Sequence, residues 1–194
     1  MIKVGVTGGI GSGKTFVCGK LKERGIPVYN CDDEAKRMMQ ECSNIKEELC
    51  SLIGNKAYID GRLNKSAIAE FLFANSENGK KINSIVHPAV KKDFAEWTEK
   101  QNAPLVVQEC ALLYEAGFQS TVDVVIAIDA PVDVRIERAM KRDNATRQQI
   151  EARMLQQLDD KEKKRRADYD IVNDGKTNID KQIDNILKLI INRP

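Results

Sequence analysis

The sequence predicts an α/β fold with three layers, in which helices cover both faces of a mostly parallel β-sheet. Short apolar runs rich in β-branched residues alternate with helical segments, an order typical of parallel strands joined by crossover helices. A glycine-rich segment connects the first apolar run to the first helix, as in folds that bind phosphate at a helix N-terminus. The long helical stretch after the second run predicts an insertion into this framework.

The chain begins with a predicted strand at residues 2–7, because Ile2-Lys3-Val4-Gly5-Val6-Thr7 is a β-branched run suited to burial. A helix is expected at 15–24 and a short strand at 26–29. Asp32 or Asp33 can cap the helix that follows, which should run to about Gln40.

Residues 43–101 are predicted to be almost wholly helical. We expect interruptions at Gly54, at the turn Asp60-Gly61 and near residues 75–79, and a break or kink at Pro88. The apolar side chains that recur at helical spacing in the last part of this stretch are Ile82, Ile85, Val86, Val90, Phe94 and Trp97.

The second half of the chain returns to alternating elements. Strands are predicted at 104–109, 122–128 and 171–173, and helices after Pro131 to Lys141, from Thr146 to about Arg166, and at 179–191. The 194 residues suit a single domain, 1–194, with a helical region at about 33–101 and a lid at about 138–160.

Composition limits the partners. The net charge of +2 gives no basic surface for nucleic acid, and no apolar run approaches the roughly 20 residues that span a bilayer. The first strand leaves no room for a signal peptide before it. The five cysteines contain no C-x-x-C pair, which favours reduced thiols and a cytoplasmic location. We expect a monomer or a weak homo-oligomer that binds neither nucleic acid nor membrane.

The segment Gly8-Gly9-Ile10-Gly11-Ser12-Gly13-Lys14-Thr15 fits the phosphate-binding pattern G-x-x-x-x-G-K-[ST]. Its glycines let the backbone N–H groups point inward, so that they form an anion site at the start of a helix. Lys14 can then reach the β- and γ-phosphates of ATP, and the Thr15 hydroxyl can ligate Mg²⁺. A glycine-rich turn that binds nothing is the alternative, but a strand before the segment and a helix after it favour phosphate binding.

Two carboxylates are expected beside this loop, because the carboxyl ends of parallel strands meet at one edge of the sheet. Asp32 follows the second strand and could accept the proton of an acceptor hydroxyl, or it could simply cap a helix. Glu109 ends the third strand and could hold the water shell of the metal, or it could be a solvated carboxylate.

Three features favour a small-molecule kinase. The chain is short, and a helical block follows the second strand. Arg135, Arg138 and Arg142 lie on one predicted helix and at its end, where they would suit a lid over transferring phosphates. The same spacing also describes a solvated helix face. His87 is the only histidine, and a lone histidine can be structural or catalytic.

Several segments together resemble the dephospho-coenzyme A kinase family. Residues 6–15 look like its T-G-G-I-G-S-G-K-[ST] loop, and Asn30-Cys31-Asp32 occupies the place of its D-A-D segment, with Asn30 replacing the first aspartate. Ile85-Val86-His87-Pro88 matches its I-x-H-P signature. Ala111-Leu112-Leu113-Tyr114-Glu115 is similar to its P-L-L-[FY]-E segment, with Ala111 in place of proline.

The likeness continues to Gly175. Asp60-Gly61-Arg62-Leu63 is similar to the D-G-x-[IL] turn of the family, and residues 137–143 resemble its lid signature. Arg153 and Gln157 fit the R-x-x-x-Q that follows, and Asn173-Asp174-Gly175 fits the closing N-x-G.

The resemblance implies a P-loop kinase fold and an activity: ATP-dependent phosphorylation of the ribose 3′-hydroxyl of dephospho-CoA, which gives CoA and ADP in the last step of CoA biosynthesis. It implies that Asp32 is the base and that Lys14 and Arg142 stabilise the transferring group. Asn173 would contact the adenine, and Thr15 would hold Mg²⁺, with Glu109 acting through water. The implied ATP-binding residues are Gly9, Ile10, Gly11, Ser12, Gly13, Lys14, Thr15, Arg138, Arg142 and Asn173. The implied acceptor-binding residues are Asp32, His87, Leu112, Leu113, Tyr114 and Glu115.

Two other functions compete with this interpretation. One is a small kinase of the same fold that acts on a nucleoside, a nucleotide or another metabolite, and the segments at 85–88 and 112–115 argue against it. The other is a nucleotide-dependent switch or regulatory ATPase, for which the sequence offers no partner surface or oligomerisation motif.

Overall fold

The structure is a computed structural model that describes residues 1–75 and 77–192. Its contacts divide the chain into two compact units. The first consists of Met1–Asn30 together with Lys100–Pro194, and the second is Cys31–Glu99. Among the described residues, no helix combines the length and the apolarity that a bilayer crossing requires.

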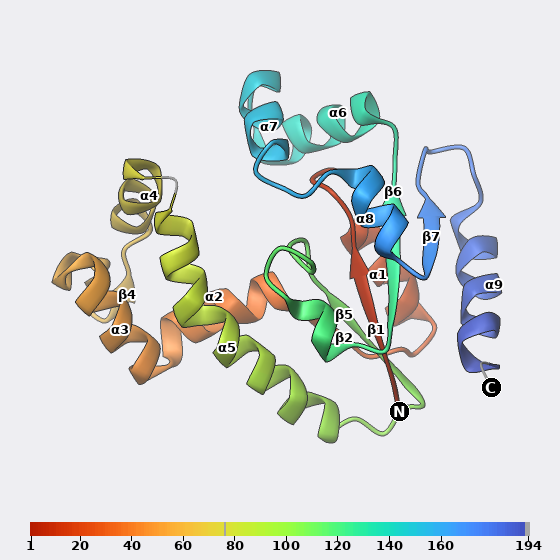
Figure 1. Ribbon diagram of the computed structural model, residues 1–194, viewed down its shortest axis with the longest axis horizontal. Helices are drawn as coiled ribbons and strands as arrows, with labels where there is room; N and C mark the ends of the chain where they lie inside the picture. The colour runs from red at the N-terminus through yellow and green to blue at the C-terminus, as the bar shows by residue number, and fades with distance from the viewer. Residues whose placement is uncertain (76, 193–194) are drawn as a thin grey trace. The chain divides into compact units, whose positions relative to one another are not determined.

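The first unit is built on a parallel sheet (Figure 1). Its strands are β1 (Ile2–Thr7), β2 (Val28–Asn30), β5 (Leu105–Glu109), β6 (Val124–Asp129) and β7 (Tyr169–Val172). They lie in the order β2-β5-β1-β6-β7, and every pair of neighbours is parallel. The predicted parallel sheet is therefore confirmed, and β1 has the bounds that the sequence predicts.

Helices α1 (Lys14–Glu23) and α9 (Ile179–Ile191) pack on one face of this sheet. The apolar side chains of α9 recur every three or four residues, so they form one stripe, and Ile183 and Ile190 are almost completely buried. They share a core with Val17 and Leu21 of α1 and with alternate strand residues such as Val4. The helix predicted at 179–191 is confirmed.

The other face of the sheet is covered by the chain that follows β5 and by α8 (Asp160–Arg166), which contacts β6. Gly5, between the two inward-facing valines of β1, points to this face. A Cβ on Gly5 would lie 2.7 Å from Leu113 Cδ1 and 3.1 Å from Val122 Cγ2. The glycine therefore allows the segment around Leu113 to pack closely on β1, and it completes the third layer of the α/β fold.

The helix predicted from Thr146 to about Arg166 is wrong, because two helices occupy this stretch. The first is α7 (Arg147–Met154), which follows α6 (Val132–Asp143) and starts at a capping box between Thr146 and Gln149. The second is α8, whose start is set by Asp159. The Asp159 side chain accepts hydrogen bonds from the N–H groups of Lys161 and Glu162 and so creates a new N-terminus.

The second unit is mainly helical. It contains α2 (Cys31–Glu41), α3 (Ser43–Ile53), α4 (Lys65–Ala74) and α5 (Asn78–Glu99), and a 3₁₀ turn at Asn55–Ala57 precedes a small hairpin of β3 (Tyr58–Ile59) and β4 (Arg62–Leu63). The sequence predicts the turn of this hairpin, where Asp60 and Gly61 both have positive φ, but not its strands. The predicted interruption between α4 and α5 is present, and residue 76 lies outside the described residues.

Two helix predictions in this unit are corrected. Asp32 and Asp33 lie inside the first turn of α2, which begins at Cys31, so neither is its cap. The helix α5 continues through Pro88, so of the predicted break or kink the break is wrong. A proline inside a helix costs about 3 kcal/mol. Burial of Ile82 and Val86 before Pro88, and of Val90 and Phe94 after it, offsets that cost.

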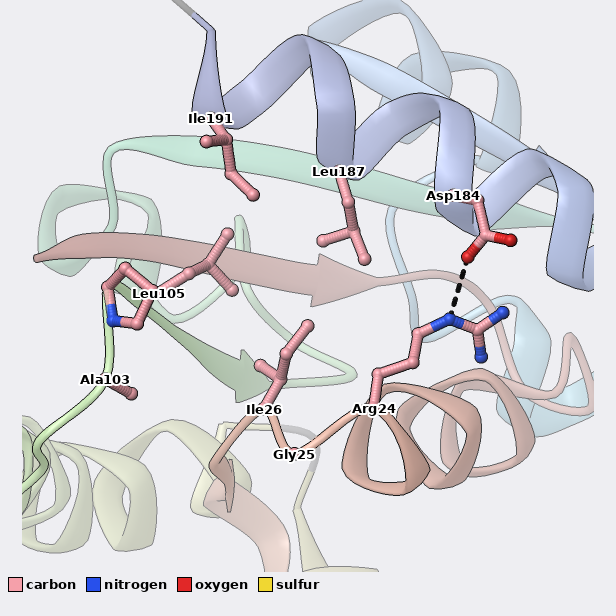
Figure 2. Close-up of a pocket in the computed structure, with 9 residues that line it drawn as sticks. Arg24, Gly25, Ile26, Ala103, Leu105, Asp184, Leu187 and Ile191 are labelled. Atoms are coloured by element: carbon pink, nitrogen blue, oxygen red, sulfur yellow. Dashed lines mark hydrogen bonds and ion pairs between the residues drawn. The ribbon is translucent and has the colours of Figure 1, made fainter.

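A cavity of about 370 Å³ opens in the first unit where the strands begin (Figure 2). Apolar side chains line it, among them Ile26, Leu105 and Leu187, and Arg24 forms an ion pair with Asp184 beside them. The glycine-rich loop follows the other end of β1, so this cavity is separate from the predicted phosphate site.

Candidate active site

The predicted phosphate loop connects the end of β1 at Thr7 to the start of α1 at Lys14. Gly13, the last residue of the loop, has φ 93°, a left-handed conformation that favours glycine. A Cβ at Gly13 would overlap the Asn173 side-chain amide. The loop therefore depends on this glycine for both its backbone conformation and its packing.

Two side chains make the loop suitable for an anion. The Lys14 ammonium donates hydrogen bonds to the carbonyls of Gly8 and Gly9, at 2.9 and 3.3 Å, so it lies across the loop. The Ser12 hydroxyl is 1 % exposed at the residue level, and its oxygen has no hydrogen-bond partner among the described residues. A buried hydroxyl of this kind is able to donate to a phosphate oxygen.

Glu109, at the end of β5, receives hydrogen bonds from three side chains, two on α1 and one on β2. The Thr15 hydroxyl donates to Oε1 at 2.7 Å and the Asn30 amide donates to Oε2 at 3.1 Å. The thiol of Cys18 forms a further hydrogen bond with this carboxylate, and burial followed by the nearby Glu109 charge raises the pKa of Cys18. The structure thus brings Thr15 and Glu109 together, as predicted from the strand ends, and adds Asn30 and Cys18.

This donor set fits Mg²⁺, which prefers hard oxygen ligands and usually keeps several waters and substrate phosphates in its shell. The Thr15 hydroxyl and the Glu109 carboxylate lie within hydrogen-bond distance of each other, at the start of the helix that follows the loop. Thr15 is thus the direct ligand that the geometry offers, and Glu109 can accept from a metal-bound water.

Arg138 and Asn173 also lie beside the loop. The Asn173 side-chain amide donates to the carbonyl of Ser12 at 2.8 Å, and the Asn173 backbone carbonyl accepts from Arg138 at 2.9 Å. The Arg138 guanidinium is 3.9 Å from the position that a Cβ on Gly13 would occupy. The Asn173 amide therefore supports the loop directly, and its predicted contact with adenine stays a prediction.

Arg142 is placed differently. It lies near the end of α6, its side chain is 63 % exposed, and it forms an ion pair with the adjacent Asp143. Asp143 also pairs with Arg153 of α7. The pKa of Asp143 is lowered chiefly by its hydrogen bond with Arg142, despite partial burial. The structure thus joins Arg142 to α7 through Asp143, and brings Arg138 but not Arg142 to the phosphate loop.

The predicted acceptor segment, residues 111–115, is anchored in the first unit. Leu113 is fully buried, so it is part of the core. The Arg166 guanidinium lies 4.1 Å from the centre of the Tyr114 ring. The Glu115 carboxylate pairs with the buried Lys163 at 2.9 Å and accepts from the Leu158 N–H at 2.8 Å.

The remaining predicted residues, Asp32 and His87, belong to the second unit, where α2 packs against α5. Burial, and then the charge of Lys91, lower the pKa of His87, while the Asp32 carboxylate acts in the opposite direction. Asp32 is thus close enough to influence the imidazole.

Sequence reasoning missed several residues that hold the site. Cys18, Lys163 and Asp160 were not singled out, Gln157 was noted without a role, and Arg135 was expected in a lid rather than as a support of the loop. Residues of this kind act through contacts with distant parts of the chain: Ile10 of the loop, for example, is hydrogen-bonded to both Arg135 and Gln157. The one available signal is the position of Gln157 in the R-x-x-x-Q pattern.

Comparisons with known proteins agree on one family. The family model described as dephospho-CoA kinase matches residues 2–178. The chain is 42% identical over 190 residues to the dephospho-CoA kinase of Bacteroides fragilis, a match that covers 97% of this chain and 91% of the relative. The dephospho-CoA kinase of Salinibacter ruber is also 42% identical, over 92% of each chain.

Solved structures show the same fold. A crystal structure from Thermus thermophilus superposes with a TM-score of 0.87 at 32% identity and covers 99% of this chain and 98% of its own. The dephospho-CoA kinase of Campylobacter jejuni has a TM-score of 0.67 at 24% identity, with coverage of 97% and 95%. A shikimate kinase from Bacteroides thetaiotaomicron, with a TM-score of 0.57 at 13% identity and 98% coverage of both chains, extends the likeness of fold to a further kinase.

Proposed function

The chain belongs to the dephospho-CoA kinase family, and we propose that it transfers the γ-phosphoryl group of ATP to the ribose 3′-hydroxyl of dephospho-CoA. The observation that carries the proposal is the cluster of Lys14, Thr15 and Glu109 around a glycine-rich loop at the carboxyl edge of the sheet. In a parallel sheet this edge is where ligands bind.

ATP would lie with its phosphates against the loop. The N-terminus of α1, the Ser12 hydroxyl and the Lys14 ammonium supply donors for the phosphate oxygens. Thr15 and, through water, Glu109 would hold Mg²⁺, which when bound neutralises charge on the β- and γ-phosphates. Asn173 would support this site by holding the Ser12 carbonyl.

Asp32 would act as the general base. The 3′-hydroxyl oxygen attacks the γ-phosphorus, its proton passes to the Asp32 carboxylate, and the bond between the γ-phosphorus and the bridging oxygen breaks to release ADP. His87 would contribute to the acceptor site beside Asp32. Leu112 and Tyr114 would contact the acceptor, with Leu113 and Glu115 fixing their segment from behind.

Residues 138–160 would form the lid. Arg138 already lies next to the phosphate loop, and Arg142, which is held by Asp143, would reach the transferring phosphoryl group when the lid closes. Closure would exclude water, so that ATP is not hydrolysed in the absence of acceptor.

We further propose that the protein acts in the cytoplasm as a monomer or a weak homo-oligomer and binds neither nucleic acid nor membrane. The five cysteines, all within the described residues, form no disulfide, which supports a reducing compartment.

The acceptor is tested by measuring ADP release in three reactions: with dephospho-CoA, with adenosine or nucleotides, and with water only. We expect that, among these reactions, only the one with dephospho-CoA strongly increases ADP release. An ATPase rate that dephospho-CoA does not change would rule out the proposed reaction, and stimulation by another acceptor would assign a different kinase activity.

The base is tested with Asp32→Asn, which keeps the shape of the side chain and removes its basicity. We expect kcat to fall about 10²–10⁴-fold with little change in ATP affinity. The matched control is Asp33→Asn, since Asp33 is also exposed in the first turn of α2 and pairs only weakly with Lys36 at the surface. Near-normal turnover of Asp32→Asn would exclude Asp32 as the base.

The phosphate site is tested with Lys14→Ala. Loss of the ammonium should remove at least two orders of magnitude from kcat, because this charge stabilises the transferring group in a site from which water is excluded. Retained activity would show that the γ-phosphate binds elsewhere.

A further inference from the structure

Both backbone polar groups of Ile10, in the middle of the phosphate loop, are bound by side chains that follow much later in the sequence. The Ile10 N–H donates to Gln157 Oε1 at 2.9 Å, and the Ile10 carbonyl accepts from Arg135 Nε at 3.0 Å. Arg135 belongs to α6, and Gln157 lies between α7 and α8. The loop is therefore held from outside as well as by its own backbone.

Arg135 is a buried cation with a fixed geometry. It is 2 % exposed, and its NH1 group forms an ion pair with Asp160 at the start of α8. A buried charge is strongly destabilising unless it is paired and hydrogen-bonded. Because the guanidinium is a planar fork, it can donate to Asp160 and to the Ile10 carbonyl at the same time.

Two glycines of the loop leave room for this arginine. A Cβ on Gly9 would overlap the Arg135 guanidinium and the Asp160 carboxylate, and a Cβ on Gly11 would overlap the Arg135 backbone carbonyl. Gly9 is not among the glycines with positive φ, so the close approach of Arg135 is what requires a glycine there. The loop and α6 thus fit each other without space for a side chain.

The chain that supplies Gln157 and Asp160 is itself anchored at a second place. Leu158, between them, donates its N–H to Glu115, and Lys163 of α8 pairs with the same carboxylate and donates to the Ala111 carbonyl at 3.1 Å. Residues 157–163 therefore contact the phosphate loop through one set of side chains and the 111–115 segment through another.

We propose that Arg135, Asp160 and Gln157 form a clamp that positions the phosphate loop for phosphoryl transfer through Ile10. None of the three needs to touch a substrate, so they are positioning residues. The proposal rests on the proposed function for its catalytic consequence. Its effect on ATP binding does not depend on which acceptor the enzyme uses.

The main test compares Gln157→Leu with Gln156→Leu. Gln157→Leu removes the acceptor of the Ile10 N–H. Gln156→Leu is the control, because it replaces glutamine by leucine at the neighbouring exposed position. Both are measured well below their thermal midpoints of unfolding. We expect Gln157→Leu to bind a fluorescent ATP analogue about tenfold more weakly in the absence of acceptor, and to lower kcat by about 10–100-fold, because small displacements of a reacting group are costly.

A double-mutant cycle with Arg135→Lys separates positioning from general stability. Lysine keeps the charge for Asp160 but lacks the second donor of the fork. Because Arg135 and Gln157 act on one residue, their effects on ATP-analogue affinity should be clearly less than additive. If Arg135→Lys does not fold, the comparison of Gln157→Leu with Gln156→Leu decides alone.

The clamp is overturned if Gln157→Leu and Gln156→Leu agree within twofold in both ATP-analogue affinity and kcat, or if the cycle is additive. A wild-type protein that shows no ADP release with dephospho-CoA would refute the proposed function instead, and it would leave the ATP-binding comparison intact as the test of the clamp.

Discussion

At the end of β2, Asn30 occupies the position where the sequence pattern of the dephospho-CoA kinase family has an aspartate. The hydrogen-bond partner of Asn30 explains why an amide fits this position. Its amide donates to Glu109, which also accepts from Thr15. An aspartate at position 30 would set two carboxylates against each other. The amide and the glutamate therefore form a compatible pair beside the phosphate loop.

We predict that Asn30→Asp lowers the free energy of unfolding by about 1–3 kcal/mol, because Glu109 is buried, loses a donor and gains a like charge. Urea denaturation at neutral pH measures the loss. Asn102→Asp, at an exposed loop position of the same unit, is the control and should change stability by less than about 0.5 kcal/mol. Equal stability of the two variants would contradict the pairing.

The ion pair between Glu115 and Lys163 yields a second prediction. Lys163 is 1 % exposed, so Glu115→Gln leaves a buried ammonium without its counter-charge and should cost about 3 kcal/mol of unfolding free energy. Glu162→Gln, in α8, breaks a more exposed pair with Arg165 and should therefore cost clearly less than Glu115→Gln. Similar losses in the two variants would show that the buried pair contributes little.

The same pair makes stability dependent on pH. Burial alone would raise the pKa of Glu115, but hydrogen bonds from Lys163 and from the Leu158 N–H lower it overall. Because the folded state then binds the proton less well than the unfolded state, this contribution is complete above the usual carboxyl range and is lost as the pH falls through it. The unfolding free energies of the wild type and of Glu115→Gln, measured by denaturation, should therefore approach each other in acid.

At the scale of single elements, α5 shows that packing can keep a helix continuous through a proline. Pro88 predicts a break or a kink, yet the helix continues because buried side chains lie on both sides of the proline. His87 immediately precedes this proline in α5. The charge of Asp32, on α2, acts to raise the pKa of the His87 imidazole.

His87 can be tested directly, since it is the only histidine in the chain. Burial and Lys91 lower its pKa, so we expect NMR titration of its ring to give a value below the usual 6.5. Asp32→Asn should lower it further, because the carboxylate favours the charged ring. Because the pKa of His87 is lowered in the folded state, the unfolded chain takes up the proton first as the pH drops below about 6.5. The unfolding free energy of the wild type should therefore fall in this range. A pKa above 6.5 would contradict this arrangement.

Elements with a strong periodic pattern were predictable, and short ones were not. The β-branched run of β1 and the apolar stripe of α9 gave the bounds that the structure has. The strands β3 and β4 contain too few residues to show alternation, although Asp60-Gly61 marks their turn. The separation of α7 from α8 depends on capping by Asp159, a local contact that competes with a charge pattern suited to one helix.

For the whole molecule, strand order did most to make the site predictable. Parallel strands bring Glu109 and the loop to one edge of the sheet, and that follows from the sequence without coordinates. The contacts of Ile10 with Arg135 and Gln157 could not be derived in this way, because they depend on how α6 and the chain after α7 pack on the loop. The sequence could name the groups that face phosphate, but not those that hold them in place.

The second compact unit occupies a single interval of the chain, from Cys31 to Glu99, between β2 and β5. These two strands are parallel neighbours, so the chain needs a crossover between them in any case. The unit Cys31–Glu99 is therefore one long connection between two paired strands, and replacing it would leave every strand pairing of the first unit in place.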